Sequence, residues 1–258
     1  MTSLSDLKLY CEIKGAGPAL VVLHPAGLDQ SFMARLVEAA AVSHRVLGVD
    51  LCGHGRSPDA PEGMTLAHQA AWVREAMHRH GMEAAGVLGL SLGGMVAQTL
   101  ALDFPQSVTS LILCGCTGGF AAELQPVLRE RGLAARNAGM QAVVGPTLER
   151  WFTPAFMDHL DVHAVRQRLL QDKPLNWAAT WEAISGFNVL SRLAEVTVPT
   201  LVVAGDRDTA TPLAATEVLA SAIVGARRSI LPGAPHMMQI ESGDLFNQAV
   251  LQFLAEKR

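Results

Sequence analysis

The chain has 258 residues, a net charge of −4 at pH 7 and a charged fraction of 17%. This length suits a single α/β domain with a sizeable core. Because the basic residues are scattered and outnumbered by acidic ones, we expect a small-molecule partner and no nucleic acid. No stretch resembles a secretion signal, and no run of about 18 apolar residues occurs. We therefore expect a cytoplasmic protein with no membrane partner.

The four cysteines show neither the spacing of a metal site nor the density of a disulfide-stabilised secreted domain. Free cysteine is among the most frequently buried residue types. We therefore expect reduced core residues at all four positions, which are Cys11, Cys52, Cys114 and Cys116.

Strand and helix patterns alternate through the first half of the chain. Residues 7–13 alternate apolar and polar side chains as an edge strand does, and later apolar runs are typical of strands buried on both faces. The predicted buried strands are residues 19–23, 45–49, 86–90 and 107–113, and the predicted helices are residues 32–42, 66–80 and 92–102. Ser31 and Thr65 are the expected caps of the first two helices. The alternation predicts a mostly parallel sheet covered by helices on both faces.

The alternation stops after residue 117, and the pattern is helical from residue 120 to about residue 193. Strand character then returns. The later predicted elements are a strand at 200–204, a helix from 212, a short strand at 228–231 and an amphipathic helix at 245–254. We therefore expect a core made of residues 1–117 and 196–258, with a helical cap of residues 118–195 inserted into it.

Ser91 lies where a buried strand turns directly into a buried helix, in the sequence GLSLG at residues 89–93. Such a turn crowds the backbone, so the positions two before and two after the serine favour glycine. The turn would expose the serine oxygen beside the free N–H groups of the helix N-terminus. Ser91 is therefore the predicted nucleophile.

A serine nucleophile needs a base, and the base needs an acid that orients it. His236 follows a late strand directly, at the sheet edge where a parallel sheet gathers its loops. Asp206 and Asp208 both follow the strand at 200–204, and we favour Asp208 because it stands farther into the turn. The other position at which this fold can hold its acid, residues 114–116, reads Cys-Gly-Cys and offers no carboxylate.

Charge that develops on a substrate carbonyl needs two N–H donors. Leu92 N–H, at the start of the helix after the nucleophile, is one candidate. The second should come from HPAG at residues 24–27, where Pro25 has no N–H, so Ala26 is the candidate. The ring of His24 is expected to brace this loop.

The sequences HPAG, DLCGHGRS, GLSLGG, GDRD and GAPH resemble the α/β-hydrolase superfamily in order and spacing, over nearly the whole chain. The resemblance implies a catalytic triad of Ser91, Asp208 and His236, an oxyanion hole formed by Ala26 and Leu92, and no cofactor or metal. Members of the superfamily usually carry glycine where this chain has proline in HPAG, and the N-terminal strand region looks shortened.

Within the superfamily, residues 150–157 and 177–184 resemble the 3-oxoadipate enol-lactonases of aromatic-acid breakdown. This similarity implies that Trp151 lines the substrate pocket. Arginines of the predicted cap would then hold a substrate carboxylate. The cap arginines considered are Arg129, Arg131 and Arg136.

The sequence thus predicts a serine hydrolase that cleaves a small lactone or carboxylic ester through an acyl-enzyme, with an enol-lactone as one candidate substrate. Three alternatives stay open: a cofactor-free perhydrolase or haloperoxidase, a carbon–carbon bond hydrolase, and a ligand-sensing protein of the same fold. Haloalkane dehalogenase chemistry is excluded because it needs a carboxylate in place of Ser91. The oligomeric state is left undetermined.

Overall fold

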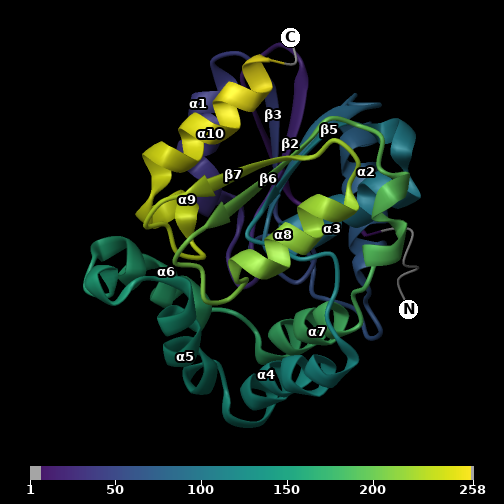
Figure 1. The fold of residues 1–258 in the computed structure, drawn as a ribbon. Helices are drawn as coiled ribbons and strands as arrows, with labels where there is room; N and C mark the ends of the chain where they lie inside the picture. Colours follow the sequence, from purple (N-terminus) through teal and green to yellow (C-terminus); the bar gives the residue numbers. More distant parts are fainter. Residues whose placement is uncertain (1–6, 257–258) are drawn as a thin grey trace.

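In residues 7–256, the part of the chain that the computed structural model describes, seven strands form one sheet (Figure 1). The strand order is β1-β3-β2-β4-β5-β6-β7; β1 pairs antiparallel with β3, and all the other pairs are parallel. The strands are β1 (Cys11–Lys14), β2 (Ala19–Leu23), β3 (Arg45–Val49), β4 (Ala85–Leu90), β5 (Val108–Cys114), β6 (Thr200–Gly205) and β7 (Arg227–Leu231).

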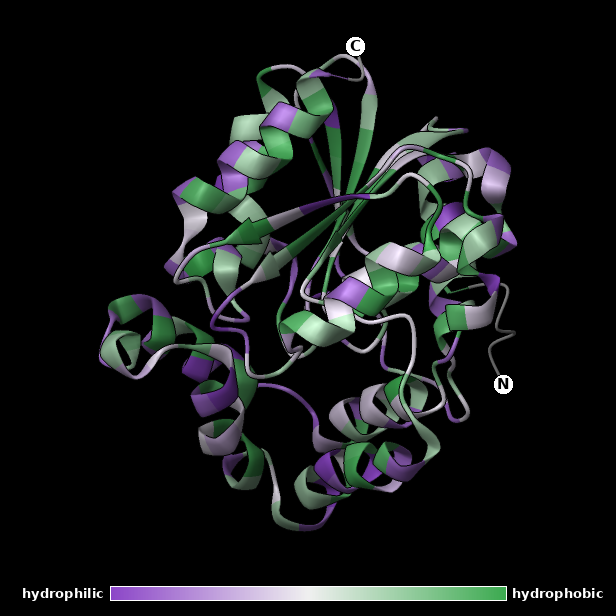
Figure 2. Cartoon of the chain, viewed as in Figure 1, coloured by the Kyte–Doolittle hydropathy of each residue, from purple (hydrophilic) through white to green (hydrophobic). Residues whose placement is uncertain are grey.

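The central strands are buried on both faces, and Figure 2 shows them as predominantly hydrophobic. Helices α1 and α10 cover one face of the sheet, and α2, α3 and α8 cover the other (Figure 1). These helices, with the short α9, are α1 (Ala34–Ala41), α2 (Leu66–Arg79), α3 (Leu92–Asp103), α8 (Leu213–Ala222), α9 (Met238–Glu241) and α10 (Gly243–Ala255). Every residue of α3 except Asp103 is buried, so this helix is fixed firmly against the sheet.

Four helices between β5 and β6 lie across the carboxyl ends of the strands (Figure 1). They are α4 (Gln125–Ala138), α5 (Gln141–Trp151), α6 (Leu160–Leu170) and α7 (Pro174–Ser185), joined with the 3-10 turns Ala122–Leu124, Pro154–Phe156 and Leu190–Glu195. We call α4–α7 the helical layer. Parallel sheets hold ligands at the carboxyl ends of their strands. The helical layer therefore covers the edge of the sheet at which a ligand would bind.

The predicted fold class is confirmed, but several local expectations are wrong. The first strand begins at Cys11 rather than residue 7, because its partner β3 ends at Val49, which pairs with Cys11. Asp29 rather than Ser31 caps the turn before α1, since its carboxylate accepts the Ser31 N–H at 3.0 Å. Cys11 is only half-buried, whereas the other three cysteines are buried, and all four are free thiols.

The first helical turn of residues 30–33 is 3-10, and α1 proper begins at residue 34 rather than 32. Thr65 caps α2 as predicted, with its hydroxyl accepting the His68 N–H at 3.3 Å. Between residues 7 and 256, no helix is both long and apolar enough to cross a membrane.

Candidate active site

Ser91 occupies the sharp turn between β4 and α3, with φ 53° and ψ −114°; among residues 7–256 it is the only non-glycine residue with positive φ. A Cβ atom added at Gly89 would lie 2.1 Å from the carbonyl oxygen of Gly93. A Cβ atom at Gly93 would lie 2.4 Å from the carbonyl oxygen of Leu23 on β2. The two glycines therefore permit the close backbone approach that holds Ser91 in a strained conformation.

His236 lies between Ser91 and Asp208. The Ser91 Oγ–His236 Nε2 distance is 3.0 Å and the His236 Nδ1–Asp208 Oδ2 distance is 2.8 Å. The other carboxylate oxygen, Oδ1, accepts the N–H groups of Ala210 at 2.8 Å and Thr211 at 2.7 Å. An acceptor-only carboxylate places the imidazole proton on Nδ1, which leaves the Nε2 lone pair free to accept the serine hydroxyl proton.

The neighbouring Asp206 points elsewhere: its Oδ1 accepts the Gly233 N–H at 2.7 Å and so holds the turn after β7. Gly115, at the position after β5, packs beside the acid, and a Cβ atom there would lie 3.3 Å from Asp208 Oδ2. Its carbonyl oxygen accepts the Thr211 hydroxyl at 3.0 Å. The segment after β5 therefore supports the loop that carries Asp208 without supplying a carboxylate of its own.

The loop after β2 brings Ala26 to the same cavity as Ser91. Strands β2 and β4 are neighbours at the point where the strand order reverses, which is where open α/β sheets form their ligand crevice. Leu92 is the first residue of α3, so its N–H has no acceptor within the helix. Both predicted N–H donors thus belong to the loops that flank this crevice.

His24 braces the loop through both ring nitrogens. Its Nδ1–H donates to the carbonyl oxygen of Pro25 at 2.8 Å, and its Nε2 accepts the Leu51 N–H at 2.9 Å. Burial lowers the pKa of His24, which keeps the ring neutral, as the Nε2 acceptor role requires. The loop after β2 is therefore tied to the end of β3.

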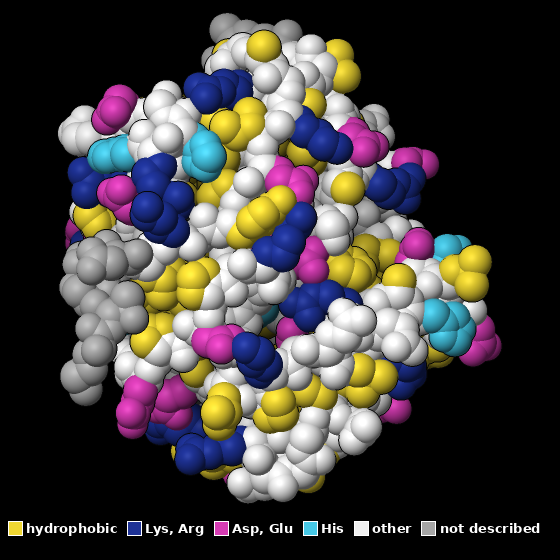
Figure 3. Space-filling model, turned by 180° about the vertical axis from the view of Figure 1, so that it is seen from behind, with side chains coloured by type: hydrophobic (Ala, Val, Ile, Leu, Met, Phe, Trp, Pro, Cys, Tyr) yellow, Lys and Arg dark blue, Asp and Glu magenta, His cyan; other side chains and the backbone are white. Residues whose placement is uncertain are grey.

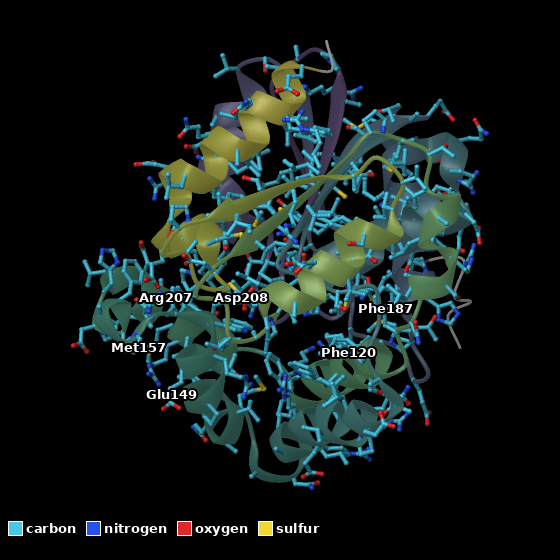
Figure 4. The ribbon with its side chains drawn as sticks, viewed as in Figure 1. Phe120, Glu149, Met157, Phe187, Arg207 and Asp208 are labelled. Atoms are coloured by element: carbon cyan, nitrogen blue, oxygen red, sulfur yellow. The ribbon has the colours of Figure 1, made fainter. Side chains whose placement is uncertain are left out.

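A cavity of about 150 Å³ lies between Ser91 and the helical layer. Trp151, at the end of α5, lines it with its ring centroid 6.4 Å from that of His236, and its carbonyl oxygen accepts the Met237 N–H at 3.0 Å. Figure 4 shows Asp208 in the loop after β6 and Phe120, which also lines the cavity, where the chain enters the helical layer. The cavity is thus bounded by core loops above and by the helical layer below.

Of the three arginines considered from the sequence, only Arg131 lines this cavity. Arg129 pairs with Glu182 at 2.9 Å, and it lines a separate depression together with Arg136. Sequence reasoning missed Arg150, another lining residue, although it directly precedes Trp151 in the segment already singled out. Trp181 was missed in the same way. Their helical positions alone did not show which face of α5 or α7 points inward.

Within the described residues, no group of three or more His, Cys, Asp or Glu side chains is arranged to hold a metal ion. Acidic and basic side chains are interspersed on the face seen in Figure 3. The charged or hydroxyl-bearing side chains that line the cavity, with the imidazole, are those of Ser91, Thr211, His236, Arg131 and Arg150.

Residues 19–243 match the sequence model of the alpha/beta hydrolase fold family. Among curated relatives, a 3-oxoadipate enol-lactonase 2 of Acinetobacter baylyi is 28% identical over 236 residues, which cover 90% of this chain and 87% of that protein. A pimeloyl-[acyl-carrier protein] methyl ester esterase of Aeromonas hydrophila is 30% identical over 249 residues, which cover 93% and 96%.

Two solved structures are close in shape to this one. A hydrolase from Pseudomonas aeruginosa has a TM-score of 0.91 at 30% identity, covering 98% of this chain and 99% of that chain. The enol-lactonase from Burkholderia xenovorans has a TM-score of 0.90 at 31% identity, covering 96% of each chain. These similarities cover between 87% and 99% of the length of each of the four proteins named.

Proposed function

Because the chain belongs to the alpha/beta hydrolase family and is a hydrolase, we propose that it cleaves a small carboxylic ester or lactone through an acyl-enzyme. The observation that carries this proposal is the continuous hydrogen-bonded series from Ser91 through His236 to Asp208, with distances of 3.0 and 2.8 Å. Residues 118–195 would act as a cap that shields the reacting groups from water.

In the proposed reaction, Ser91 Oγ attacks the carbonyl carbon while His236 Nε2 takes the hydroxyl proton. Asp208 holds the imidazole in the productive tautomer and stabilises the imidazolium. Collapse of the tetrahedral intermediate breaks the C–O bond, and His236 donates the proton to the leaving oxygen. Water then attacks the acyl-enzyme with His236 as base, which releases the acid and restores Ser91.

The negative charge on the carbonyl oxygen would be stabilised by the N–H groups of Ala26 and Leu92. Both belong to rigid segments, one braced by the buried His24 and the other at the start of the buried helix α3. Donors held in place before reaction need no reorganisation as charge develops. Removing one such donor from an oxyanion hole typically costs about 10²–10³ in kcat.

Two features favour a small substrate. The cavity has a volume of only about 150 Å³, and Trp151 occupies the side next to His236. The relatives include a lactonase and a methyl ester esterase, which supports ester-bond substrates of these two kinds. We propose that Trp151 contacts the substrate and that an enol-lactone is among the compounds to examine first.

The test is hydrolysis of p-nitrophenyl acetate by purified wild-type protein and by Ser91→Ala. Loss of the Oγ nucleophile should reduce turnover to the level of the reaction without protein, while the thermal unfolding midpoint stays close to that of wild type. Ser221→Ala is the matched control, because Ser221 is an exposed serine on α8 that does not line the cavity. Undiminished turnover by folded Ser91→Ala would refute the mechanism.

A further inference from the structure

A largely buried arginine of the helical layer binds the loop that carries the predicted oxyanion donor Ala26. Arg168 on α6 donates from Nε to Asp29 Oδ2 at 2.7 Å and from Nη1 to Asp172 Oδ1 at 2.6 Å. None of these three side chains is more than 15% exposed. Asp29 lies at the end of the loop after β2, whereas Asp172 lies just after α6. One guanidinium group therefore joins α6 to the loop after β2.

Burial distinguishes this cluster from the other ion pairs between residues 118–195 and the core. Among the described residues, those other pairs are Lys173–Asp59 and Arg192–Asp103. Both side chains of the first pair are exposed, and in the second pair Asp103 is exposed and Arg192 is half-exposed. Solvent screens exposed charges, so such pairs constrain geometry only weakly. The buried guanidinium group, by contrast, is held in a fixed plane by charge-assisted hydrogen bonds.

The helical layer also packs against the middle of the same loop. A Cβ atom added at Gly27, where φ is 71°, would lie 2.5 Å from Leu169 Cδ2 on α6 and 2.7 Å from Trp177 Cζ3 on α7. It would also lie 3.4 Å from Asp172 Oδ2. Because these contacts leave no space for a side chain, the backbone next to Ala26 lies directly against both helices.

The core holds this loop mainly at its two ends. At the start, the buried ring of His24 is hydrogen-bonded to the Pro25 carbonyl oxygen at 2.8 Å. At the far end, the Gln30 N–H donates to Asp50 Oδ1 at 2.9 Å. Between these points, the Leu28 N–H reaches the Pro25 carbonyl oxygen only at 3.4 Å, which is a long hydrogen bond. The middle of the loop therefore depends on the contacts that α6 and α7 supply.

The charge of Arg168 also acts on the histidine that braces the loop. Burial lowers the pKa of His24, and the positive charge of Arg168 acts in the same direction. Burial likewise lowers the pKa of the adjacent His54 to about 3, again with a contribution from Arg168. A neutral His24 ring is required for its Nε2 to accept an N–H. Arg168 thus supports the loop through its hydrogen bonds and through its charge.

We propose that Arg168 is a positioning residue for hydrolysis at Ser91: it holds the loop that carries Ala26 against α6, so that the oxyanion hole is complete only when the helical layer is docked. This inference rests on the proposed function. Arg168 is not among the described residues that line the cavity, so it acts through the loop and not on the substrate. A displaced oxyanion donor weakens stabilisation of the transition state more than it weakens substrate binding.

The kinetic test measures hydrolysis of p-nitrophenyl acetate by Arg168→Gln, whose uncharged amide cannot bind two carboxylates. We expect kcat to fall by about tenfold to a hundredfold, because loss of an oxyanion donor costs about 10²–10³ and here the donor is displaced, not lost. KM should change by less than about threefold. Arg168→Lys keeps the charge without the planar guanidinium group, so its kcat should lie between those of wild type and Arg168→Gln.

The matched control is Arg166→Gln, which removes the same charge from another half-buried arginine on α6. Its kcat should stay within about threefold of wild type. Since Arg168→Gln leaves two buried carboxylates without their partner, each protein is titrated to completion with diethyl p-nitrophenyl phosphate, which releases one nitrophenolate per functional Ser91. An equal loss of kcat in Arg166→Gln, or a loss that disappears when kcat is expressed per functional site, would overturn the proposal.

Asp29→Asn tests the same contact from the side of the loop. Asparagine keeps an oxygen that accepts the Ser31 N–H, but it removes the charge that binds Arg168. Alone, it should lower kcat by about threefold to tenfold. Added to Arg168→Gln, it should lower kcat by less than about threefold more, because both substitutions remove one contact. Fully additive losses would show that the two residues act separately and would contradict the proposal.

Hydrogen–deuterium exchange separates this inference from the proposed function. The amides of residues 24–28 should exchange at least about tenfold faster in Arg168→Gln than in wild type, and at the wild-type rate in Arg166→Gln. If wild type hydrolysed no ester yet exchange changed in this way, the proposed reaction would fail and the positioning of the loop would stand. If wild type were active but Arg168→Gln changed neither kcat nor exchange, the positioning role alone would be overturned.

Discussion

At the scale of single residues, two aspartates in one turn have entirely different partners. Asp208 reaches His236 Nδ1 at 2.8 Å, and its second oxygen is held by two backbone N–H groups. Asp206 instead accepts the N–H of Gly233 at 2.7 Å. The difference arises because the turn after β6 directs these two side chains to different loops. Only one of them can orient the imidazole.

Replacing Asp208 with Asn should lower kcat for p-nitrophenyl acetate by about 10⁴, because an amide N–H beside Nδ1 favours the wrong imidazole tautomer. Asp206→Asn should retain activity within about threefold, since an amide oxygen can still accept the Gly233 N–H. Steady-state rates of the two variants measure the difference. Equal losses in both would contradict the assignment of Asp208 as the orienting acid.

At the scale of elements, the turn between β4 and α3 depends on contact between backbones. The residues around Ser91 approach the neighbouring strand β2 so closely that Gly93 has no space for a Cβ atom. Since α3 is almost wholly buried, it cannot move away to make room. The position of the serine is therefore set by the packing of a strand, a helix and the strand beside them.

Gly93→Ala should lower the free energy of unfolding by about 1–3 kcal/mol, the usual cost of overpacking a core, and should displace Ser91 enough to impair turnover. Gly186→Ala is the control, because Gly186 is exposed and the nearest atoms to its Cβ would lie 3.9 Å and 4.0 Å away. Urea denaturation should show the control within about 0.5 kcal/mol of wild type. A neutral Gly93→Ala would disprove the close contact.

At the scale of the whole molecule, a buried ion cluster joins the helical layer to the sheet. Arg168 on α6 binds both Asp172, just after that helix, and Asp29, in the loop that follows β2. Asp172 Oδ2 also lies close to Gly27, so the cluster contacts the loop that carries Ala26. Burial raises the pKa of Asp172 to about 7, while the Ser31 and Arg168 hydrogen bonds outweigh burial and lower the pKa of Asp29.

The raised pKa of Asp172 makes stability depend on pH. Between about pH 4 and pH 7 the folded state retains a proton that the unfolded state releases, so this group's contribution falls as pH rises, by at most about 1.4 kcal/mol per unit. Asp172→Asn keeps an acceptor for Arg168 without titrating. The unfolding free energy of Asp172→Asn minus that of wild type should therefore increase from pH 5 to pH 8.

Urea titrations of both proteins across this range provide the measurement. Burial also lowers the pKa of His24 and His54, and these two groups make the unfolding free energy of both proteins rise with pH. The quantity to compare is therefore the difference in unfolding free energy between Asp172→Asn and wild type at each pH. Gln171→Ala, at an exposed neighbour of Asp172 that carries no titratable group, is the control, and its difference from wild type should not grow with pH. A difference that is constant with pH would refute the shifted titration of Asp172.

Much of the fold follows from local sequence patterns. Continuous apolar runs identify the parallel strands, and the predicted strand at 19–23 agrees with β2 to the residue. The patterns do not predict the length of a strand when that length depends on the neighbouring strand. Strand β1 is shorter than its alternation suggests because β3 ends opposite Cys11. A single sequence shows that a segment can form a strand, but only the neighbouring strand sets how much of it pairs.

The same division holds for the candidate site. The sequence by itself predicted Ser91 as the nucleophile, from a glycine-flanked serine between a strand and a helix together with the motifs that follow it, and it predicted that Asp208 and His236 come after late strands. Only the tertiary structure decided which arginines face the cavity, bringing in Arg131 and Arg150 and leaving out Arg129. The physical reason is that backbone crowding is local, whereas the direction of a helix face depends on everything packed around it.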